Sequence, residues 1–434
     1  MAHLPLNSLL GRRVVVLAGL VAFLYLSVWV TRACIADQLA RRPTIKSLRL
    51  AVRLDPGNSE YHLRLARLAQ YSLEEMNPDL AMAQLLVSAR LNPRDPQPWL
   101  ELSAAQGFQG NSMAAEASLR RADSLAPHLP AVQWVIGNFF LLHGDVDEAF
   151  RHFKTVLAGS GEYNRILFST AWKASDDGAK ILRELIPEKV GTEMDYLYYL
   201  LSQQQYPEAE EVWRRIAASP EKFPPGSVGG YFDGLIVARL PEEAALVWKD
   251  LQKKGLIKPI YQPRADNLIV NGDFEEDLLN MGFDWRVYPR EGIYAGLEGS
   301  NFHSPSRALL IVFSGKENVN YQNAYQYVRV SPGRSYRLTG FLKTDGITTD
   351  SGPRLEVRDA YDPSALMKFS EALTGTSSGW SQVILDFSTG PKTALVVVGV
   401  VRLPSTKLDN LIAGKVWVDD VSLTPLPTEV ARAR

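Results

Sequence analysis

At the stretch NLIVNGDFEE, residues 267–276, the spacing of apolar residues changes abruptly in this chain of 434 residues. A short apolar run stops in a Gly-Asp turn, and an aromatic residue and three carboxylates follow at once. After this stretch, apolar and polar residues alternate in short runs, which is typical of β-strands. Before it, apolar residues recur at helical spacing. The sequence therefore predicts a multidomain protein that is helical first and all-β afterwards.

Short alternating runs separated by turns predict the strands of the C-terminal part. In SYRLTGFLK (335–343), Tyr336, Leu338, Gly340 and Leu342 share one face of the expected strand. The predicted strands are 267–271, 307–313, 321–330, 335–343, 354–359, 381–388, 394–402 and 415–423. This number of strands fits one antiparallel sandwich over residues 267–425, with a tail at 426–434. Residues 256–266 hold two prolines and no apolar face, so they are expected to be a linker.

A repeated motif organises the region before the linker. AVRLDP (51–56), SARLNP (88–93) and ADSLAP (122–127) end in prolines that are 37 and then 34 residues apart. The pair Ala115 and Leu119 recurs as Ala149 and Phe153, again 34 residues on. Small residues at such positions let paired helices approach closely. The region resembles the tetratricopeptide repeats, whose usual length is 34 residues.

This resemblance implies about six helical hairpins over residues 47–255 and a groove that binds a protein partner. The candidate groove residues come from the first helix of each pair: Gln106, Gln109, Asn138 and His143. The alternative is that these four side chains are simply solvated positions on a helix.

Residues 14–31 form an uncharged apolar stretch near the N-terminus. Eighteen residues in a helix span roughly 27 Å, enough to cross the core of a bilayer. We expect an uncleaved transmembrane anchor between a cytoplasmic segment, 1–13, and a juxtamembrane segment, 32–46; a cleaved signal peptide is the alternative. Arg12 and Arg13 favour a cytoplasmic N-terminus, whereas the basic residues at 41, 42, 46 and 49 argue for the reverse orientation.

Six segments of the C-terminal part together carry a second resemblance. They are NLIVNGDFEE (267–276), GFDWRV (282–287), HSPSRALLI (303–311), YVRVSPGRSYRLTGFLKT (327–344), GWSQVILDF (379–387) and VWVDDVSL (416–423). In this order they resemble the galactose-binding-like jelly rolls, particularly the carbohydrate-binding modules found beside xylanases and glucanases. The resemblance implies a jelly-roll sandwich, in which Trp285 and Trp380 pack the interior.

The same resemblance implies a structural calcium ion. Its ligands would be the backbone oxygen of Asp273, the carboxylates of Glu275 and Asp419, and a backbone oxygen near Arg307. Calcium prefers six to eight hard oxygens. Ser304 stands where a carboxylate is offered in relatives, so Asp420 or water would complete the site. The alternative is an empty site in which Glu275 binds neighbouring backbone groups.

Carbohydrate-binding modules of this kind hold sugars with aromatic and polar side chains on one sheet face. The corresponding candidates here are Gln322, Tyr325, Gln326, Arg354, Glu356 and Arg358. Arg354, Glu356 and Arg358 alternate along one strand, so they form either a sugar-facing row or a plain solvated face.

Composition and motifs exclude other classes of function. The formal net charge of −1 provides no field that would recruit nucleic acid. The sequence lacks a Walker loop and a zinc-protease motif, and we expect no enzyme. We expect a single-pass protein of a bacterial inner membrane, with repeats and sandwich in the periplasm, that serves the assembly or export of a surface polysaccharide. The alternative is a scaffold of an envelope complex whose sandwich makes only protein contacts.

Overall fold

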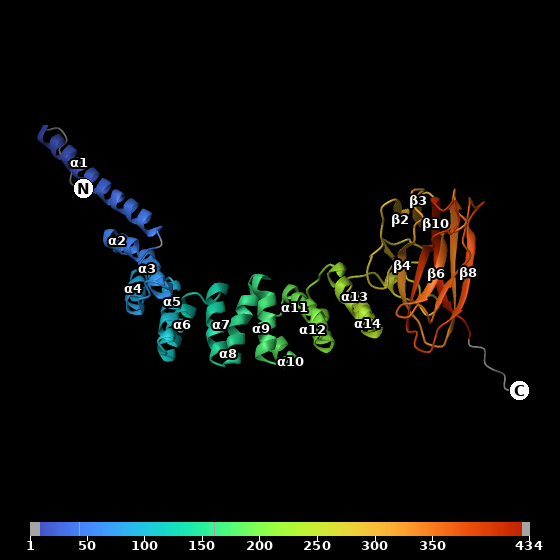
Figure 1. The fold of residues 1–434 in the computed structure, drawn as a ribbon, viewed down its shortest axis with the longest axis horizontal. Helices are drawn as coiled ribbons and strands as arrows, with labels where there is room; N and C mark the ends of the chain where they lie inside the picture. Colours follow the sequence, from blue (N-terminus) through green and yellow to red (C-terminus); the bar gives the residue numbers. More distant parts are fainter. Residues whose placement is uncertain (1–8, 43, 160, 428–434) are drawn as a thin grey trace. The chain divides into compact units, whose positions relative to one another are not determined.

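The computed structural model describes residues 9–42, 44–159 and 161–427. Within these residues, helices occupy the first part of the chain and two antiparallel sheets form a sandwich in the last part, as predicted (Figure 1). The chain divides into two compact units, Met1–Thr192 and Glu193–Arg434. The start of the predicted cytoplasmic segment and the end of the predicted tail, 1–8 and 428–434, lie outside the described residues.

Helix α1 (Leu9–Ala40) contains the apolar stretch and continues beyond it. Residues Gly11–Ala40 are long and apolar enough to cross a membrane, and the apolar stretch is not buried by the rest of the chain. The end of α1 is different, because Ala36 and Ala40 pack into a small core with Leu48 and Tyr61. The expected juxtamembrane segment therefore begins as a continuation of the helix.

The other helices of the first unit follow one another in antiparallel pairs. They are α2 (Ile45–Leu54), α3 (Ser59–Tyr71), α4 (Pro78–Leu91), α5 (Gln97–Phe108), α6 (Ser112–Leu125), α7 (Pro130–Leu142), α8 (Val146–Ala158), α9 (Asn164–Ala174) and α10 (Gly178–Lys180), which a π-helical turn, Ile181–Leu185, extends. Contacts are densest between α3 and α4, α5 and α6, and α7 and α8.

Small residues allow these pairs to pack closely, as the repeat predicted. Ala115 and Ala149 are fully buried in α6 and α8. Gly137 in α7 lies under the ring of Phe153 in α8, and a Cβ atom at Gly137 would meet that ring at 2.4 Å. Since real Cβ atoms do not approach so closely, glycine is required there.

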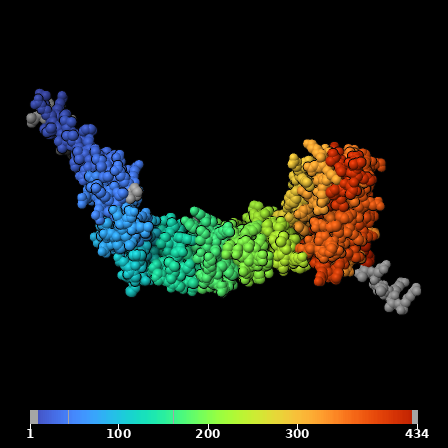
Figure 2. Space-filling view, in the orientation of Figure 1, coloured from blue at the N-terminus to red at the C-terminus, as the bar shows by residue number. Residues whose placement is uncertain are grey.

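The second unit begins within α11 (Val190–Ser202) and holds three further helices and the sandwich. These helices are α12 (Tyr206–Ala218), α13 (Gly229–Val237) and α14 (Pro241–Lys253). Phe232 of α13, Trp248 of α14 and Phe283 of the sandwich form a cluster of three edge-to-face ring pairs. In the space-filling view the yellow-green surface of these helices continues into the orange surface of the sandwich (Figure 2). The last hairpin and the sandwich therefore share a core.

The segment expected to be a linker takes part in this core. Ile257 and Tyr261 are buried, at 5% and 3% exposure. The carbonyl of Tyr261 accepts the indole N–H of Trp248 at 2.7 Å, and its hydroxyl donates to the carbonyl of Asp277 at 2.6 Å. The segment between the two prolines is therefore a packed connection, because Tyr261 makes hydrogen bonds to Trp248 of α14 and to Asp277.

Two five-stranded antiparallel sheets form the sandwich. The first sheet has the order β1-β4-β9-β6-β7 and the second has the order β2-β3-β10-β5-β8. The strands are β1 (Arg286–Val287), β2 (Ile293–Glu298), β3 (Ala308–Ser314), β4 (Tyr321–Arg329), β5 (Ser335–Asp345), β6 (Arg354–Asp359), β7 (Met367–Phe369), β8 (Ser381–Ser388), β9 (Leu395–Arg402) and β10 (Ala413–Pro425). The predicted core tryptophan Trp285 is fully buried against Phe274, whereas Trp380 is only half-buried.

The prediction of a strand at 267–271 was wrong. The segment is extended but forms only isolated bonds: Leu268 donates its N–H to the carbonyl of Leu423 at 2.9 Å. Gly272 then approaches β10 so closely that a Cβ there would lie 2.0 Å from the carbonyl oxygen of Val421. The sequence also did not reveal the short strands β1 and β7 or the strand β2.

Candidate functional site

The outer face of the first sheet gathers four of the six predicted carbohydrate-binding residues. Ala324, Val328, Leu355 and Val357 point into the core of the sandwich, so their neighbours on the same strands point outwards. Cross-strand register aligns Tyr325 of β4, Gly399 of β9 and Glu356 of β6 in one row. Arg354 and Arg358 lie on either side of Glu356 on β6 and share its outward face. We call these four side chains (Tyr325, Arg354, Glu356 and Arg358) the outer row.

Within the outer row, Glu356 pairs with Arg358 and is not itself open to solvent. It is 1% exposed and forms an ion pair with Arg358 at 3.5 Å. Burial raises the pKa of Glu356, and the nearby Arg358 opposes this shift. Tyr325, Arg354 and Arg358 are half-buried. The groups of this face that a ligand can reach are therefore a phenol ring and two guanidinium groups.

Two predicted carbohydrate-binding residues lie outside the outer row. Gln326 is fully buried on the opposite face of β4, where its amide accepts the N–H of Val270 at 2.9 Å and donates to the carbonyl of Val270 at 2.8 Å. It therefore replaces the strand partner that residues 267–271 lack, so its prediction as a sugar-binding residue is corrected. Gln322 is exposed at an irregularity in the pairing of β4 with β9.

The last helical hairpin borders this face. Arg286 of β1 is 4% exposed and makes two hydrogen bonds to Asp233 of α13, at 2.5 and 3.1 Å. The guanidinium of Arg286 also lies 5.3 Å from the centre of the Tyr327 ring, beside Tyr325. A buried guanidinium needs such partners because an unpaired buried charge is costly. The sequence did not single out Arg286 or Tyr327; the alternation of β4, which places Tyr327 beside Tyr325 on one face, was the available signal.

The carboxylates of the two predicted calcium ligands Asp419 and Glu275 are both engaged by donors of the protein itself. Asp419 is fully buried, and its carboxylate accepts the N–H groups of His303 at 2.7 Å and Ser304 at 2.9 Å, the hydroxyl of Ser304 at 3.0 Å and the N–H of Asp420 at 2.8 Å. Four donors thus surround this carboxylate. Ser304, noted as the departure from the calcium-binding pattern, supplies two of them.

Glu275 is engaged in a similar way. Its carboxylate accepts the N–H of Arg307 at 3.0 Å and the hydroxyl of Ser306. The guanidinium of Arg307 binds the carbonyl of Glu275 and the carboxylate of Asp277. Donors and a cation therefore stand where calcium would need free oxygens, so these residues as arranged do not fit the ion. Among the described residues no three His, Cys, Asp or Glu side chains are grouped for a metal, and calcium stays a prediction.

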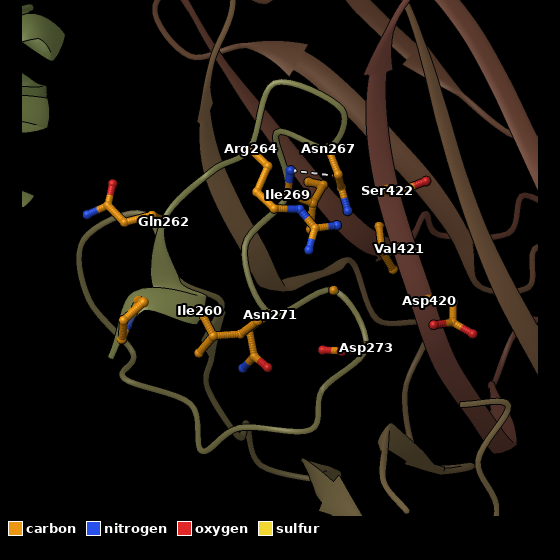
Figure 3. A pocket seen from close by; sticks show the side chains of 12 residues that line it. Ile260, Gln262, Arg264, Asn267, Ile269, Asn271, Asp273, Asp420, Val421 and Ser422 are labelled. Carbon is orange, nitrogen blue, oxygen red and sulfur yellow. Dashed lines mark hydrogen bonds between the residues drawn. The ribbon is translucent and has the colours of Figure 1, made fainter. Parts of the chain in front are cut away.

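Asp273 faces a different place, an open pocket of about 600 Å³ between the connection after α14 and β10. Asn267, Ile269, Asn271 and Asp273 line one side of it, and β10 lines the other (Figure 3). Asn271 is not available to a ligand, because its amide donates to the carbonyl of Glu276 and accepts its N–H. The pocket therefore lies beside the turn formed by NGDF (271–274), and Asp273 lies at its edge.

Three of the four predicted groove residues of the repeats make hydrogen bonds within their own hairpins. Gln106 accepts the hydroxyl of Ser118 at 2.8 Å, and the amide of Asn138 donates to its own helix. His143 ends α7, where its Nδ1 lies 2.8 Å from the carbonyl of Phe139. Gln109 ends α5 and is exposed. None of these contacts tests protein binding, so the groove stays a prediction.

A buried polar network lies between α6, α7 and α8. Gln133 donates to Asp123 at 2.6 Å, so its oxygen accepts the Nδ1–H of His152 at 2.6 Å. Burial lowers the pKa of His152, which keeps the imidazole neutral. Asp123 and His152 border a pocket of about 310 Å³ that Glu148 and Arg151 also line. Sequence reasoning missed this network because its members are far apart along the chain.

Comparison with known proteins identifies no family. No family model matches the chain, and no curated protein matches it. Solved structures share parts of it: the CBM22-2 xylan-binding domain of Paenibacillus barcinonensis Xyn10C is 17% identical, with 36% of this chain and 98% of that one aligned and a TM-score of 0.25. MamA is 14% identical over 44% of this chain and 90% of its own, with a TM-score of 0.26.

The tailspike protein 4 of bacteriophage CBA120 is 14% identical over 37% of this chain, with a TM-score of 0.26. The match covers only 21% of that solved chain, which comprises the enzymatically active domain of the tailspike. Similarities at these TM-scores say nothing about what this chain binds.

Proposed function

We propose that this protein is a membrane-tethered, non-catalytic scaffold whose sandwich binds carbohydrate on the outer face of the first sheet. The observation that carries the proposal is the placement of Tyr325 beside Tyr327, with the half-buried Arg354 and Arg358 on the same face. Sugars stack their apolar faces on aromatic rings and accept hydrogen bonds from guanidinium groups at their hydroxyls.

The helical part supports the scaffold role. α1 presents an apolar surface that no other part of the chain buries, which suits a bilayer. The hairpins that follow would bind a protein partner through Gln106, Gln109, Asn138 and His143. By analogy with sugar-binding sandwiches, which meet polymers outside the cytoplasm, we place repeats and sandwich in the periplasm at a bacterial inner membrane, in the assembly or export of a surface polysaccharide.

The carbohydrate proposal is tested with the full chain in non-ionic detergent. Native electrophoresis through gels that contain soluble polysaccharides should retard the protein, and Tyr325→Ala should abolish the retardation. Arg337→Ala is the matched control, because Arg337 is exposed on β5 of the other sheet and pairs with Asp386 at 2.7 Å. Equal retardation of wild type and Tyr325→Ala, or no retardation by neutral and acidic polymers alike, would overturn the proposal.

A second function is favoured by the joint between hairpin and sandwich. Arg286 binds Asp233, and Arg329 of β4 binds Glu242 of α14, so the sandwich already uses part of its surface for protein contacts. In this alternative the sandwich caps the helical array within an envelope complex and binds no sugar. Recovery of one specific partner by cross-linking in membranes, together with no retardation in any polysaccharide gel, would support it.

A further inference from the structure

A second cavity, of about 490 Å³, lies at the joint between α14 and the sandwich. Four basic side chains line it: Lys249 of α14, Arg264 of the connection, Arg329 at the end of β4 and Arg334 in the turn before β5. None of the described residues that line this cavity is acidic. We call it the basic cavity. Its four cations come from segments that are distant in the sequence but meet in the fold.

Two of these cations have carboxylate partners at the rim. Arg329 pairs with Glu242, and Arg264 pairs with Asp266 at 3.2 Å. The other two do not: within the described residues, the Lys249 ammonium and the Arg334 guanidinium have no hydrogen-bond or ion-pair partner. Both side chains are exposed. The cavity therefore carries an excess of positive charge, which attracts anions and is screened by salt.

The walls of the basic cavity are aromatic. Trp248, Phe283, Tyr327 and Tyr336 line it, and three of them are held in place. Trp248 binds the carbonyl of Tyr261, and the hydroxyl of Tyr336 accepts the N–H of Ser331 at 2.7 Å. Phe283 belongs to the ring cluster with Trp248. These three rings are only 1–5% exposed, so the half-buried ring of Tyr327 is the aromatic surface that a ligand can reach. The volume is that of a site for a small organic molecule or one or two sugar units.

Tyr327 also connects the two sites. Its ring lies beside Tyr325 of the outer row, at 5.6 Å between ring centres, and it lines the basic cavity as well. A chain of sugars on the outer face would therefore have a cationic site near one of its ends. Guanidinium groups bind planar carboxylates with two parallel hydrogen bonds, a geometry that matches the carboxylate of a uronic acid.

We propose that the basic cavity binds the carboxylate of an acidic sugar, so that the carbohydrate bound by this protein is a uronate-containing polysaccharide. This inference rests on the proposed carbohydrate-binding function and names the class of sugar.

The test compares acidic and neutral oligosaccharides of equal length. Calorimetry with the full chain in non-ionic detergent measures the Kd of trigalacturonate and of xylotriose at low and moderate salt. We expect tighter binding of trigalacturonate that weakens with salt. Lys249→Ala and Arg334→Ala should each weaken it by about tenfold, the loss of one charge-assisted hydrogen bond. Lys253→Ala, on α14 but outside the cavity, and Lys392→Ala, on an exposed turn, should leave it unchanged.

The outcomes separate this inference from the proposed function. If xylotriose binds as tightly as trigalacturonate, and Tyr325→Ala abolishes both, the sandwich binds carbohydrate but the acidic specificity is wrong. If Lys249→Ala and Arg334→Ala both bind trigalacturonate like wild type, the basic cavity is not the site. If inorganic phosphate displaces trigalacturonate at equal concentration, the cavity is a general anion site, and the uronate inference fails. If neither sugar binds at all, the proposed function fails with it.

Discussion

The indole of Trp248 in α14 lies directly on Gly282 of the sandwich. A Cβ atom at Gly282 would lie 1.8 Å from the ring, and Gly282 has a φ of +62°. Both space and backbone conformation therefore require glycine at this position. This contact fixes the last hairpin to the sandwich, and the basic cavity lies beside it because Trp248 and Phe283 form part of its wall.

Substitution of this glycine should weaken the joint. Gly282→Ala is expected to lower the free energy of unfolding of the second unit by more than about 2 kcal/mol, since strain at positive φ adds to displacement of the indole. Gly333→Ala is the matched control, with a φ of +66° and no atom within 4 Å of the added Cβ; it should cost only about 1 kcal/mol. Urea unfolding followed by tryptophan fluorescence measures both, and equal losses would contradict the proposed contact.

Two helical glycines should respond differently to replacement by alanine. Gly137→Ala should destabilise the first unit, because overpacking against Phe153 costs about 1–3 kcal/mol, more than the roughly 1 kcal/mol that alanine gains over glycine in a helix. Gly107→Ala in α5 meets no atom within 4 Å and should stabilise that unit or leave it unchanged. Urea unfolding followed by circular dichroism measures both, and stabilisation by Gly137→Ala would show that the two helices are not packed as described.

A buried carboxyl should make the second unit sensitive to pH. Asp284 is fully buried, accepts the N–H of Leu279 at 2.6 Å, and has a pKa that burial raises to about 7. Between about pH 4 and pH 7 the folded state retains a proton that the unfolded state has released, so stability should fall as pH rises through this range.

Asp284→Asn removes this titration and tests the prediction. The variant should lose less stability than wild type between pH 5 and pH 8, with a difference of roughly 1–4 kcal/mol. Differential scanning calorimetry of both proteins over this range measures it. Parallel pH profiles for the two proteins would show that Asp284 does not hold its proton in the folded state.

The effect of a chelator on the melting temperature tests whether the cluster around Asp419 binds calcium. Because its carboxylate accepts four donors, Asp419→Asn should cost about 1–3 kcal/mol. The same donors occupy the oxygens that a metal needs, so EDTA should leave the melting temperature of the sandwich unchanged. A fall on chelation that added calcium reverses would establish the metal site that the sequence resemblance implies.

The ion pair between β1 and α13 can be separated from simple packing. Asp233→Asn should destabilise the second unit by about 1–3 kcal/mol, since it leaves Arg286 buried beside a neutral amide. Asp233 is itself partly exposed, so water can hydrate its carboxylate when Arg286 is removed. Arg286→Met should therefore destabilise the second unit less than Asp233→Asn does. A double-mutant cycle of the two positions measures the coupling, and additive effects would contradict the pairing.

The sequence by itself determined the kinds of element and their order. The 34-residue spacing of Ala115 and Ala149, and the alternation in residues 335–343, are local patterns that neighbouring residues impose on the backbone. The same alternation on β6 placed Arg354, Glu356 and Arg358 on one face, so part of the outer row could be found in advance.

Only the tertiary structure decided which of these residues face a ligand. Gln326 lies on the inward face of β4 with Ala324 and Val328, and only the fold shows that its amide binds Val270, which is 56 residues away and has no strand partner. The contact of α13 and α14 with the sandwich determines the surroundings of Arg286, Lys249 and Arg334. Hydrogen bonds and burial depend on neighbours that are distant in the chain, and local periodicity does not predict these neighbours.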